Sequence, residues 1–209
     1  MKKHRIRLLV VDDHFFVRMG LTGSLNGEPD MRVVAEADNG GQAIQMYREH
    51  KPDLVIMDGR LPGMSGVETL TALRREFPNV RVLMLSIDEG EEDVYRAMQG
   101  GACGYLPKAT QLQELLRAIR AIHAGERYLP PALAARLQER GPDATLTARE
   151  REVLELASKG LTNREIGEAI GCSDTTAKWH LKNIMQKLEV TDRTEATRVA
   201  VERGILHVE

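Results

Sequence analysis

The stretch RIRLLVVDDHFF, residues 5–16, joins an almost unbroken apolar run to a pair of aspartates. Similar runs recur through residues 5–123, separated by amphipathic stretches, and they read MRVVAEA, DLVIM, VRVLMLS and CGYLP. Runs rich in Val, Ile and Leu are typical of strands buried on both faces, and the stretches between them have the length of crossover helices. The pattern therefore predicts an α/β domain of (βα)5 type with a parallel sheet.

The character of the sequence changes after His123. The segment PPALAARLQER predicts a short helix that a Gly-Pro-Asp sequence ends, and from Leu146 onward the pattern is wholly helical. We therefore expect an α/β domain at 1–124, a linker with a short helix at 125–145 and an all-α domain at 146–209.

Helix boundaries in the last segment carry explicit signals. Thr147 with Glu150 and Thr162 with Glu165 have the spacing of capping boxes, and Ser173 is a suitable N-cap after a short turn. The predicted helices are 148–159, 163–170, 174–188 and 192–203. The second and third are joined by the short turn and have the form of a helix-turn-helix.

Composition excludes several classes of protein. The 209 residues, 42% of them hydrophobic, suit two modest globular domains, and no stretch approaches the ~20 apolar residues that span a bilayer. Cys103 and Cys172 lack CxxC spacing, which argues against a disulfide framework or a structural zinc site. The net charge is -2, so any binding of nucleic acid depends on local arrangement. We expect a cytoplasmic protein with no membrane partner.

Polar residues stand where the predicted strands end. Asp12 and Asp13 end the first apolar run, Asp58 ends the third, Ser86 ends the fourth and Lys108 follows the fifth. Because the carboxyl ends of parallel strands meet at one edge of a sheet, these side chains should share a crevice. Converging carboxylates favour a hard cation such as Mg²⁺, and an aspartate beside Mg²⁺ can attack a phosphoryl group whose oxygens Lys108 and Ser86 would bind. The alternative is a set of ordinary solvated strand ends.

The chain's one tryptophan lies in the predicted helix 174–188. Four apolar residues at helical spacing form the expected core face of that helix: Ala177, Leu181, Ile184 and Leu188. The other side carries Thr175, Lys178, Trp179, Lys182 and Asn183. A tryptophan among lysines suggests insertion into the major groove of DNA. The alternative is a tryptophan that packs elsewhere in the chain or in a protein interface.

One face of the helix 192–203 carries mainly small residues, which suits self-association in a dimer. It consists of Ala196, Val199, Ala200 and Arg203. The alternative for this face is packing on its own domain.

The stretches VVDDHFFVRMGL, LVIMDGRLPGMSGVE, VLMLSI and GACGYLPK resemble a bacterial response-regulator receiver domain, which has a flavodoxin-like fold. The resemblance implies phosphorylation of one aspartate with Mg²⁺. The implied roles are phosphoacceptor for Asp58, metal site for Asp12, Asp13, Asp58 and the main-chain carbonyl of Arg60, phosphoryl-binding lysine for Lys108, and switch residues for Ser86 and Tyr105. Two departures are Gly59, where a bulkier apolar residue is usual, and Pro107, where an aliphatic is usual.

The stretches LTAREREVLELASKGLTNREIGEAI and TTAKWHLKNIMQKLEVTDRTEA resemble the LuxR-type four-helix DNA-binding domain, and the whole chain resembles the NarL/FixJ class of response regulator. The resemblance implies that Lys178, Trp179 and Lys182 face DNA, although Val or Thr is more usual at the position of Trp179.

It also implies a transcription factor, not a metabolic enzyme, that catalyses only its own phosphorylation and dephosphorylation. The implied partners are a sensor histidine kinase, promoter DNA and a second copy of the chain, with RNA polymerase as a further candidate. Two other functions stay open: a constitutive DNA binder whose receiver is only an interaction module, and a Mg²⁺-dependent phosphotransferase.

Overall fold

The computed structural model describes residues 5–87, 90–139 and 146–206, so the end of the predicted linker lies outside the described residues. The chain divides into two compact units, one of residues 1–89 with 94–134 and one of residues 135–209 with 90–93. Among the described residues, no helix is long and apolar enough to cross a membrane.

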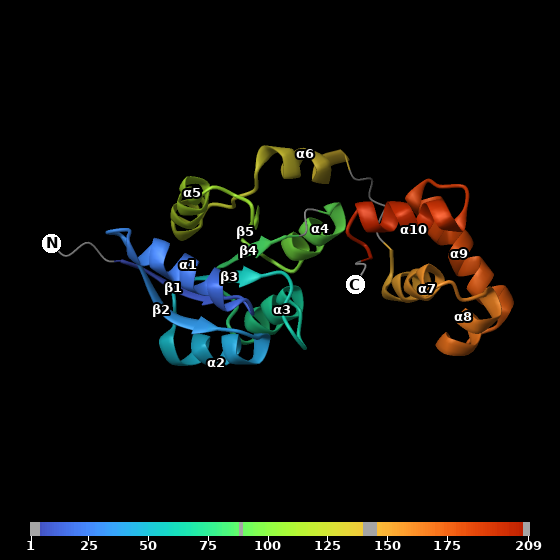
Figure 1. Ribbon diagram of the computed structural model, residues 1–209, viewed down its shortest axis with the longest axis horizontal. Helices are drawn as coiled ribbons and strands as arrows, with labels where there is room; N and C mark the ends of the chain where they lie inside the picture. Colours follow the sequence, from blue (N-terminus) through green and yellow to red (C-terminus); the bar gives the residue numbers. More distant parts are fainter. Residues whose placement is uncertain (1–4, 88–89, 140–145, 207–209) are drawn as a thin grey trace. The chain divides into compact units, whose positions relative to one another are not determined.

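A five-stranded parallel sheet forms the centre of the first unit, in the order β2-β1-β3-β4-β5 (Figure 1). The strands are β1 (Ile6–Val11), β2 (Met31–Ala37), β3 (Leu54–Asp58), β4 (Val82–Ser86) and β5 (Gly104–Pro107). Strands β3 and β4 are buried along their whole length, which explains their unbroken apolar sequence. The predicted (βα)5 class is confirmed, and each apolar run became a strand.

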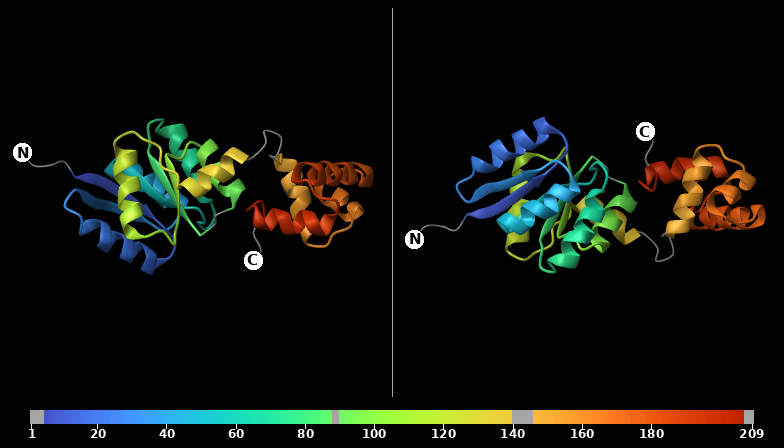
Figure 2. Two further views of the ribbon diagram at one scale, coloured as in Figure 1. Left: turned by 90° about the horizontal axis from the view of Figure 1, so that it is seen from above. Right: turned by 90° about the horizontal axis from the view of Figure 1, so that it is seen from below.

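Helices cover both faces of this sheet (Figure 2). They are α1 (Phe15–Asn26), α2 (Gly40–His50), α3 (Gly66–Glu76), α4 (Glu91–Gln99) and α5 (Leu112–His123), and α6 (Pro131–Glu139) follows. Leu25 of α1 and Ile119 of α5 join one buried cluster with Leu8 and Ile56 of the strands, so α1 and α5 lie on the same face. Helices α2 and α3 lie side by side on the other face.

The first unit continues past the predicted boundary at residue 124. Tyr128 runs along the free edge of β5: its N–H donates to the carbonyl oxygen of Cys103 at 2.9 Å, and its carbonyl accepts from the N–H of Tyr105 at 3.2 Å. The compact unit therefore reaches Ala134, ten residues beyond the predicted boundary (134 − 124).

The second unit is all-α, as predicted. Its helices are α7 (Ala148–Ser158), α8 (Asn163–Ile170), α9 (Asp174–Leu188) and α10 (Arg193–Glu202). Both predicted capping boxes are formed, at Thr147 and at Thr162, and the Ser173 side chain accepts a hydrogen bond from the N–H of Thr176 at 3.1 Å. Gly171 adopts a left-handed conformation with φ of 70°, which turns the chain sharply between α8 and α9.

Candidate functional site

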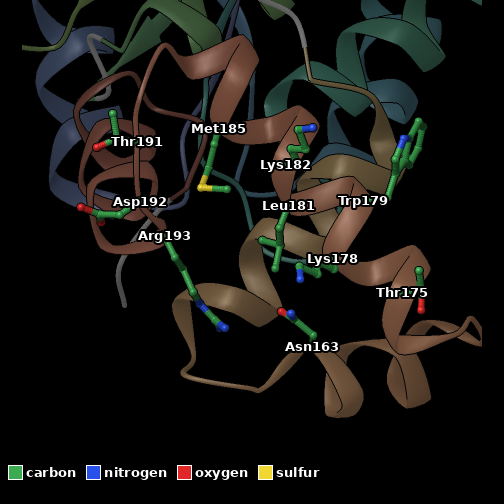
Figure 3. A pocket seen from close by; sticks show the side chains of 10 residues that line it. All are labelled: Asn163, Thr175, Lys178, Trp179, Leu181, Lys182, Met185, Thr191, Asp192 and Arg193. Atoms are coloured by element: carbon green, nitrogen blue, oxygen red, sulfur yellow. The ribbon is translucent and has the colours of Figure 1, made fainter.

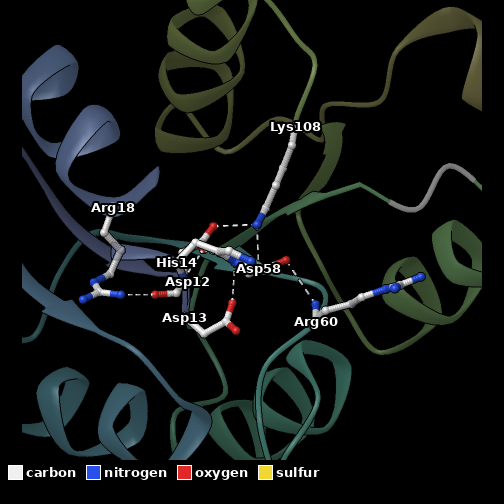
Figure 4. Close-up of polar contacts among 7 residues, drawn as sticks. All are labelled: Asp12, Asp13, His14, Arg18, Asp58, Arg60 and Lys108. Atoms are coloured by element: carbon white, nitrogen blue, oxygen red, sulfur yellow. Dashed lines mark hydrogen bonds and ion pairs between the residues drawn. The ribbon is translucent and has the colours of Figure 1, made fainter. Parts of the chain in front are cut away.

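The carboxyl edge of the sheet gathers the predicted polar residues, and Figure 4 shows Asp12, Asp13, Asp58 and Lys108 among them. Asp12 follows β1, Asp58 ends β3, Ser86 ends β4 and Lys108 follows β5. The N–H of Lys108 donates to the carbonyl oxygen of Ser86 at 2.7 Å, so the neighbouring Pro107 does not detach this segment from the sheet. The unusual proline is tolerated because β5 is an edge strand, where a missing N–H donor breaks no ladder pairing.

Lys108 forms ion pairs with two buried carboxylates at once. Its Nζ lies 2.7 Å from Oδ2 of Asp58 and 2.7 Å from Oδ2 of Asp12. Each of these aspartate side chains is only 2% exposed, whereas the Lys108 side chain is 15% exposed. The ammonium therefore supplies charge compensation that water cannot supply at this depth.

Burial and charge act against each other in this group. Burial raises the pKa of the Asp58 carboxyl above its ordinary value, although hydrogen bonds from Lys108 and from the Arg60 N–H oppose the rise. Burial acts to lower the pKa of Lys108, but the hydrogen bonds and charges of Asp12 and Asp58 outweigh it and raise that pKa. The site therefore favours the charged form of Lys108 and disfavours the charged form of Asp58.

Two residues that the sequence analysis does not identify also shape the pocket. His14 donates its N–H to Oδ1 of Asp12 at 2.9 Å and places Nδ1 2.8 Å from Oδ1 of Asp13. The Arg18 guanidinium donates to the carbonyl oxygen of Asp12 at 2.6 Å and so ties α1 to the end of β1. The signal for His14 was its place directly after the aspartate pair. No sequence signal marks Arg18, which reaches the pocket because it lies one helical turn further on.

The donor set fits a hard divalent cation. Ligand atoms of Asp12, Asp13, His14 and Asp58 all lie within 4.8 Å of one another, and carboxylate oxygens are the ligands that Mg²⁺ prefers. Asp13 is partly exposed, which leaves room on its side for the waters that Mg²⁺ keeps. The predicted ligand role of the Arg60 carbonyl stays a prediction. The N–H of that residue donates to Oδ1 of Asp58 at 3.1 Å.

Gly59 leaves space that the buried Ser86 side chain uses. A Cβ atom at Gly59 would lie 2.6 Å from Oγ of Ser86 and 3.0 Å from its Cβ, closer than real side chains approach. The departure at Gly59 thus has a structural reason, because the hydroxyl of Ser86 lies against the backbone that follows Asp58. Tyr105, the other predicted switch residue, is 2% exposed, and its ring is enclosed in the first unit.

The α9 helix separates an apolar face from a polar one, as predicted. Ala177, Leu181, Ile184 and Leu188 are all buried in the core of the second unit. Trp179 is 58% exposed, and its ring meets that of His180 edge-on, with 5.0 Å between the ring centres. The tryptophan therefore does not pack in the core of its own domain.

A groove of about 630 Å³ runs along this exposed side of α9 (Figure 3). Thr175, Lys178, Trp179 and Lys182 line it, whereas Asn183, which is half-buried, is not among its lining residues. Leu181 and Met185 of α9 also line it, and the start of α8 and the start of α10 supply the rest, at Asn163 and at 191–193. Helix periodicity did not reveal these two segments, because they join α9 only through the tertiary fold.

Two of the four residues on the face of α10 that was predicted for self-association lie in the core of the second unit. Ala196 is 1% exposed and Ala200 is fully buried, and both belong to the core of the second unit, against which Val199 also packs. The prediction of a dimer surface is therefore wrong for Ala196 and Ala200. Small residues stand there because α10 lies close to its own domain. Val199 and Arg203 are half-buried.

Two family descriptions match the chain and together cover most of it. Residues 8–120 match the response regulator receiver domain, and residues 144–200 match the luxR family of bacterial regulatory proteins.

Similar proteins carry both parts. The chain is 36% identical over 206 residues to the response regulator protein VraR of Staphylococcus aureus, covering 96% of this chain and 99% of that protein. It is 34% identical to the response regulator ChrA of a heme-sensing two-component system, with a TM-score of 0.55 over 97% of this chain and 99% of that one.

A structure of RcsB from Salmonella enterica serovar Typhimurium, bound to a promoter in the presence of the phosphomimetic BeF3-, shares the fold. It is 22% identical, with a TM-score of 0.73 over 96% of this chain and 100% of that one. Because the receiver and luxR-family matches follow each other along a chain whose relatives are matched end to end, the protein belongs to the NarL/FixJ class of two-component response regulators, with a LuxR-type DNA-binding domain.

Proposed function

We propose that this response regulator is a cytoplasmic transcription factor that is switched by phosphorylation of Asp58 and binds promoter DNA through α9. The observation that carries the proposal is the position of Asp58: a buried carboxylate, 2.7 Å from Lys108, at the edge where the other acidic residues converge. A structural ion pair would need one carboxylate for one ammonium. Here Asp12 and Asp13 add negative charge beyond what Lys108 can neutralise, and such an excess suits a cation and a phosphoryl group.

In the proposed transfer, a carboxylate oxygen of Asp58 attacks the phosphorus of a phosphohistidine on the partner kinase. The new O–P bond forms as the P–N bond breaks, and the imidazole nitrogen keeps the electron pair of that bond. Lys108 then has a phosphoryl oxygen to pair with in addition to Asp12, and the Ser86 hydroxyl donates to another. Bound Mg²⁺ would neutralise charge on the phosphoryl oxygens, held by Asp12, Asp13 and Asp58.

The switch is proposed to run from Ser86 to Tyr105. The two residues lie on neighbouring strands: β4 pairs with β5, and Tyr105 is level with Met84, two residues before Ser86. If the Ser86 hydroxyl moves toward a phosphoryl oxygen, the space it leaves changes the packing around the Tyr105 ring. A discrete change in a packed core is the kind of event that alters an exposed face.

An apolar patch beside the pocket is proposed to receive the kinase. Phe15, Phe16 and Met19 on the first turns of α1 are 61%, 78% and 53% exposed, and they follow the acidic residues directly in sequence. A partner that presents a phosphohistidine to Asp58 must contact this end of the sheet, and apolar side chains of this size are costly to expose without a partner. Phe16→Glu should slow labelling by the phosphorylated kinase and leave labelling by acetyl phosphate unchanged.

DNA is proposed to meet the exposed side of α9. Lys178 and Lys182 would approach phosphates or guanine, Trp179 would enter the major groove, and Thr175 and Asn183 would lie at its margins. Because the second unit has no excess of basic residues, one copy should bind weakly, and a homodimer on paired half-sites would supply useful affinity. Of the residues predicted for that contact, Ala196 and Ala200 are buried, so Val199 and Arg203 are the ones proposed to take part.

The test is a selection of genomic fragments by the full-length protein, with and without Mg²⁺ and beryllofluoride as a phosphoryl mimic. Enrichment of one paired motif in the beryllofluoride arm alone is the expected result. The Asp58→Ala variant, run in both arms, is the matched control and should give no difference between them. Equal enrichment by the unaltered protein in both arms would leave a DNA-binding protein and refute the switch.

A further inference from the structure

Trp179 is exposed although nothing in the fold requires a tryptophan at that position. The core face of α9 is complete without it, and its ring is 58% exposed, with His180 as its aromatic neighbour. A side chain of this size loses favourable burial when it stays in water. An unburied tryptophan in an otherwise well-patterned helix therefore points to a contact made outside the domain.

The surroundings of the ring favour a polyanion with apolar features. Lys178 and Lys182 form no ion pair with any residue that the structure describes, so their charges are available to a ligand. The same groove has Leu181 and Met185 in its lining, so its basic residues stand beside apolar side chains (Figure 3). Duplex DNA offers both properties, because its phosphates flank a major groove in which the thymine methyl group is the one apolar feature.

The single donor and apolar surface of the indole ring distinguish thymine from cytosine. It has one N–H donor, no acceptor and a large apolar surface. Thymine presents the O4 acceptor next to its C5 methyl group, whereas cytosine presents an N–H donor there and lacks the methyl. An indole therefore matches thymine with both of its features and would face cytosine donor to donor. From these observations we propose that Trp179 reads a thymine in each half-site, with its ring against the C5 methyl group. The proposal rests on the proposed DNA-binding function and names the base that it recognises.

The experiment measures affinity of the full-length protein, with Mg²⁺ and beryllofluoride, for the duplex enriched in the genomic selection. Each thymine of one half-site is replaced in turn by deoxyuridine, which removes the methyl group and keeps the base pair. At one position we expect affinity to fall about fourfold, the effect of losing one buried methyl contact of ~0.8 kcal/mol. At that position, 5-methylcytosine should bind more tightly than cytosine by a similar factor, because both pair with guanine and differ only in the methyl.

Variants separate this reading from a general contribution to binding. In Trp179→Ala the thymine and deoxyuridine duplexes should bind equally, whereas Trp179→Phe should retain the methyl effect because it keeps an apolar ring. Lys182→Ala should weaken binding to both duplexes by the same factor and leave their ratio unchanged. Both residues replaced, Trp179 and Lys182, are exposed, and unchanged thermal unfolding would establish that each variant folds.

Equal affinity for thymine and deoxyuridine at every position would overturn the proposal, and so would a methyl effect that persists in Trp179→Ala. Either result would still leave a protein that binds a selected DNA motif. Failure to enrich any DNA in either arm would instead refute the proposed function itself, so the two failures are distinguishable.

Discussion

Replacement of Lys108 by methionine should strongly destabilise the first unit. The substitution keeps most of the aliphatic stem and removes the ammonium that Asp12 and Asp58 share at 2.7 Å each. Both carboxylates are 2% exposed, so water does not replace the lost partner. Removal of one partner from a buried ion pair costs about 3–5 kcal/mol. For a domain of this size that corresponds to a fall of roughly 10–20 °C in the unfolding temperature.

The loss of stability in Lys108→Met should depend on pH, and the pKa shifts in the pocket give the direction of that dependence. Because the folded-state pKa of Asp58 is raised, the folded protein binds more protons than the unfolded chain between the two pKa values, and stability falls as pH rises through that window. Without Lys108 the folded-state pKa of Asp58 rises further, and the pH range between the folded and unfolded values widens. The loss of stability in Lys108→Met should therefore be smaller in acid, where the carboxylates are protonated. The raised pKa of Lys108 means that its contribution is complete below about pH 10.4, the ordinary lysine value, and is lost only as pH rises beyond it.

The assay is thermal unfolding followed by circular dichroism at pH 4 and pH 7, with and without Mg²⁺. Trp179 fluorescence reports the second unit alone, because the chain has one tryptophan, and its transition should not move. Arg48→Met is the matched control, since it breaks a 2.6 Å ion pair with Glu76 in which both side chains are well exposed, and it should have little effect. A Lys108→Met transition within about 3 °C of the unaltered protein at pH 7 without Mg²⁺ would refute this account of the pocket.

Three further predictions concern both units. Asp58→Asn should raise the unfolding temperature at pH 7 without Mg²⁺, since it removes a buried charge whose pKa is raised while Lys108 keeps Asp12 as its ionic partner. It should also abolish stabilisation by added Mg²⁺, and a Mg²⁺ response equal to that of the unaltered protein would contradict it. Gly59→Ala should cost about 1–3 kcal/mol and slow labelling by acetyl phosphate, because the added Cβ would lie 2.6 Å from Oγ of Ser86; unchanged denaturation and labelling would count against the clash. Burial opposes ionisation of Glu150, but hydrogen bonds led by that from Lys187 hold its pKa below the ordinary 4.5, so its contribution is present above that pH and is lost as pH falls through the folded-state pKa. Glu150→Gln should therefore lower the Trp179-fluorescence melting temperature at pH 7 more than at pH 3.

The fold could be predicted from the sequence wherever a single hydrophobic pattern, of strand or of helix type, ran through a whole element. Strands β3 and β4 are buried on both faces, so their apolar runs could not be mistaken for half-exposed strands. The all-α unit was predictable because its caps are local: a Thr side chain and a Glu three residues on satisfy each other's backbone. Tyr128 was missed because a single bridged residue at a sheet edge needs no apolar run.

The functional residues could be predicted from the sequence where the topology of the parallel sheet alone brings them together. Asp58 and Lys108 come together because their strands end at the same edge, which any parallel sheet ensures. The face of α10 was misjudged because spacing marks which residues share a side and does not say what covers that side. Ala196 and Ala200 share a face as predicted, and the core of their own domain covers it.

The two sites differ in how their charges are balanced, and that difference bears on regulation. In the pocket, Lys108 is paired with both Asp58 and Asp12, so the proposed phosphoryl group would have to alter existing ion pairs before it could be held. On α9, Lys178 and Lys182 have no ionic partner among the described residues, and Trp179 is already exposed. If α9 binds DNA as proposed, its exposed side would need no rearrangement within the second unit. Phosphorylation would then control how often two such faces act together on paired half-sites, and Asp58→Ala should alter cooperativity more than the affinity of one domain for one half-site.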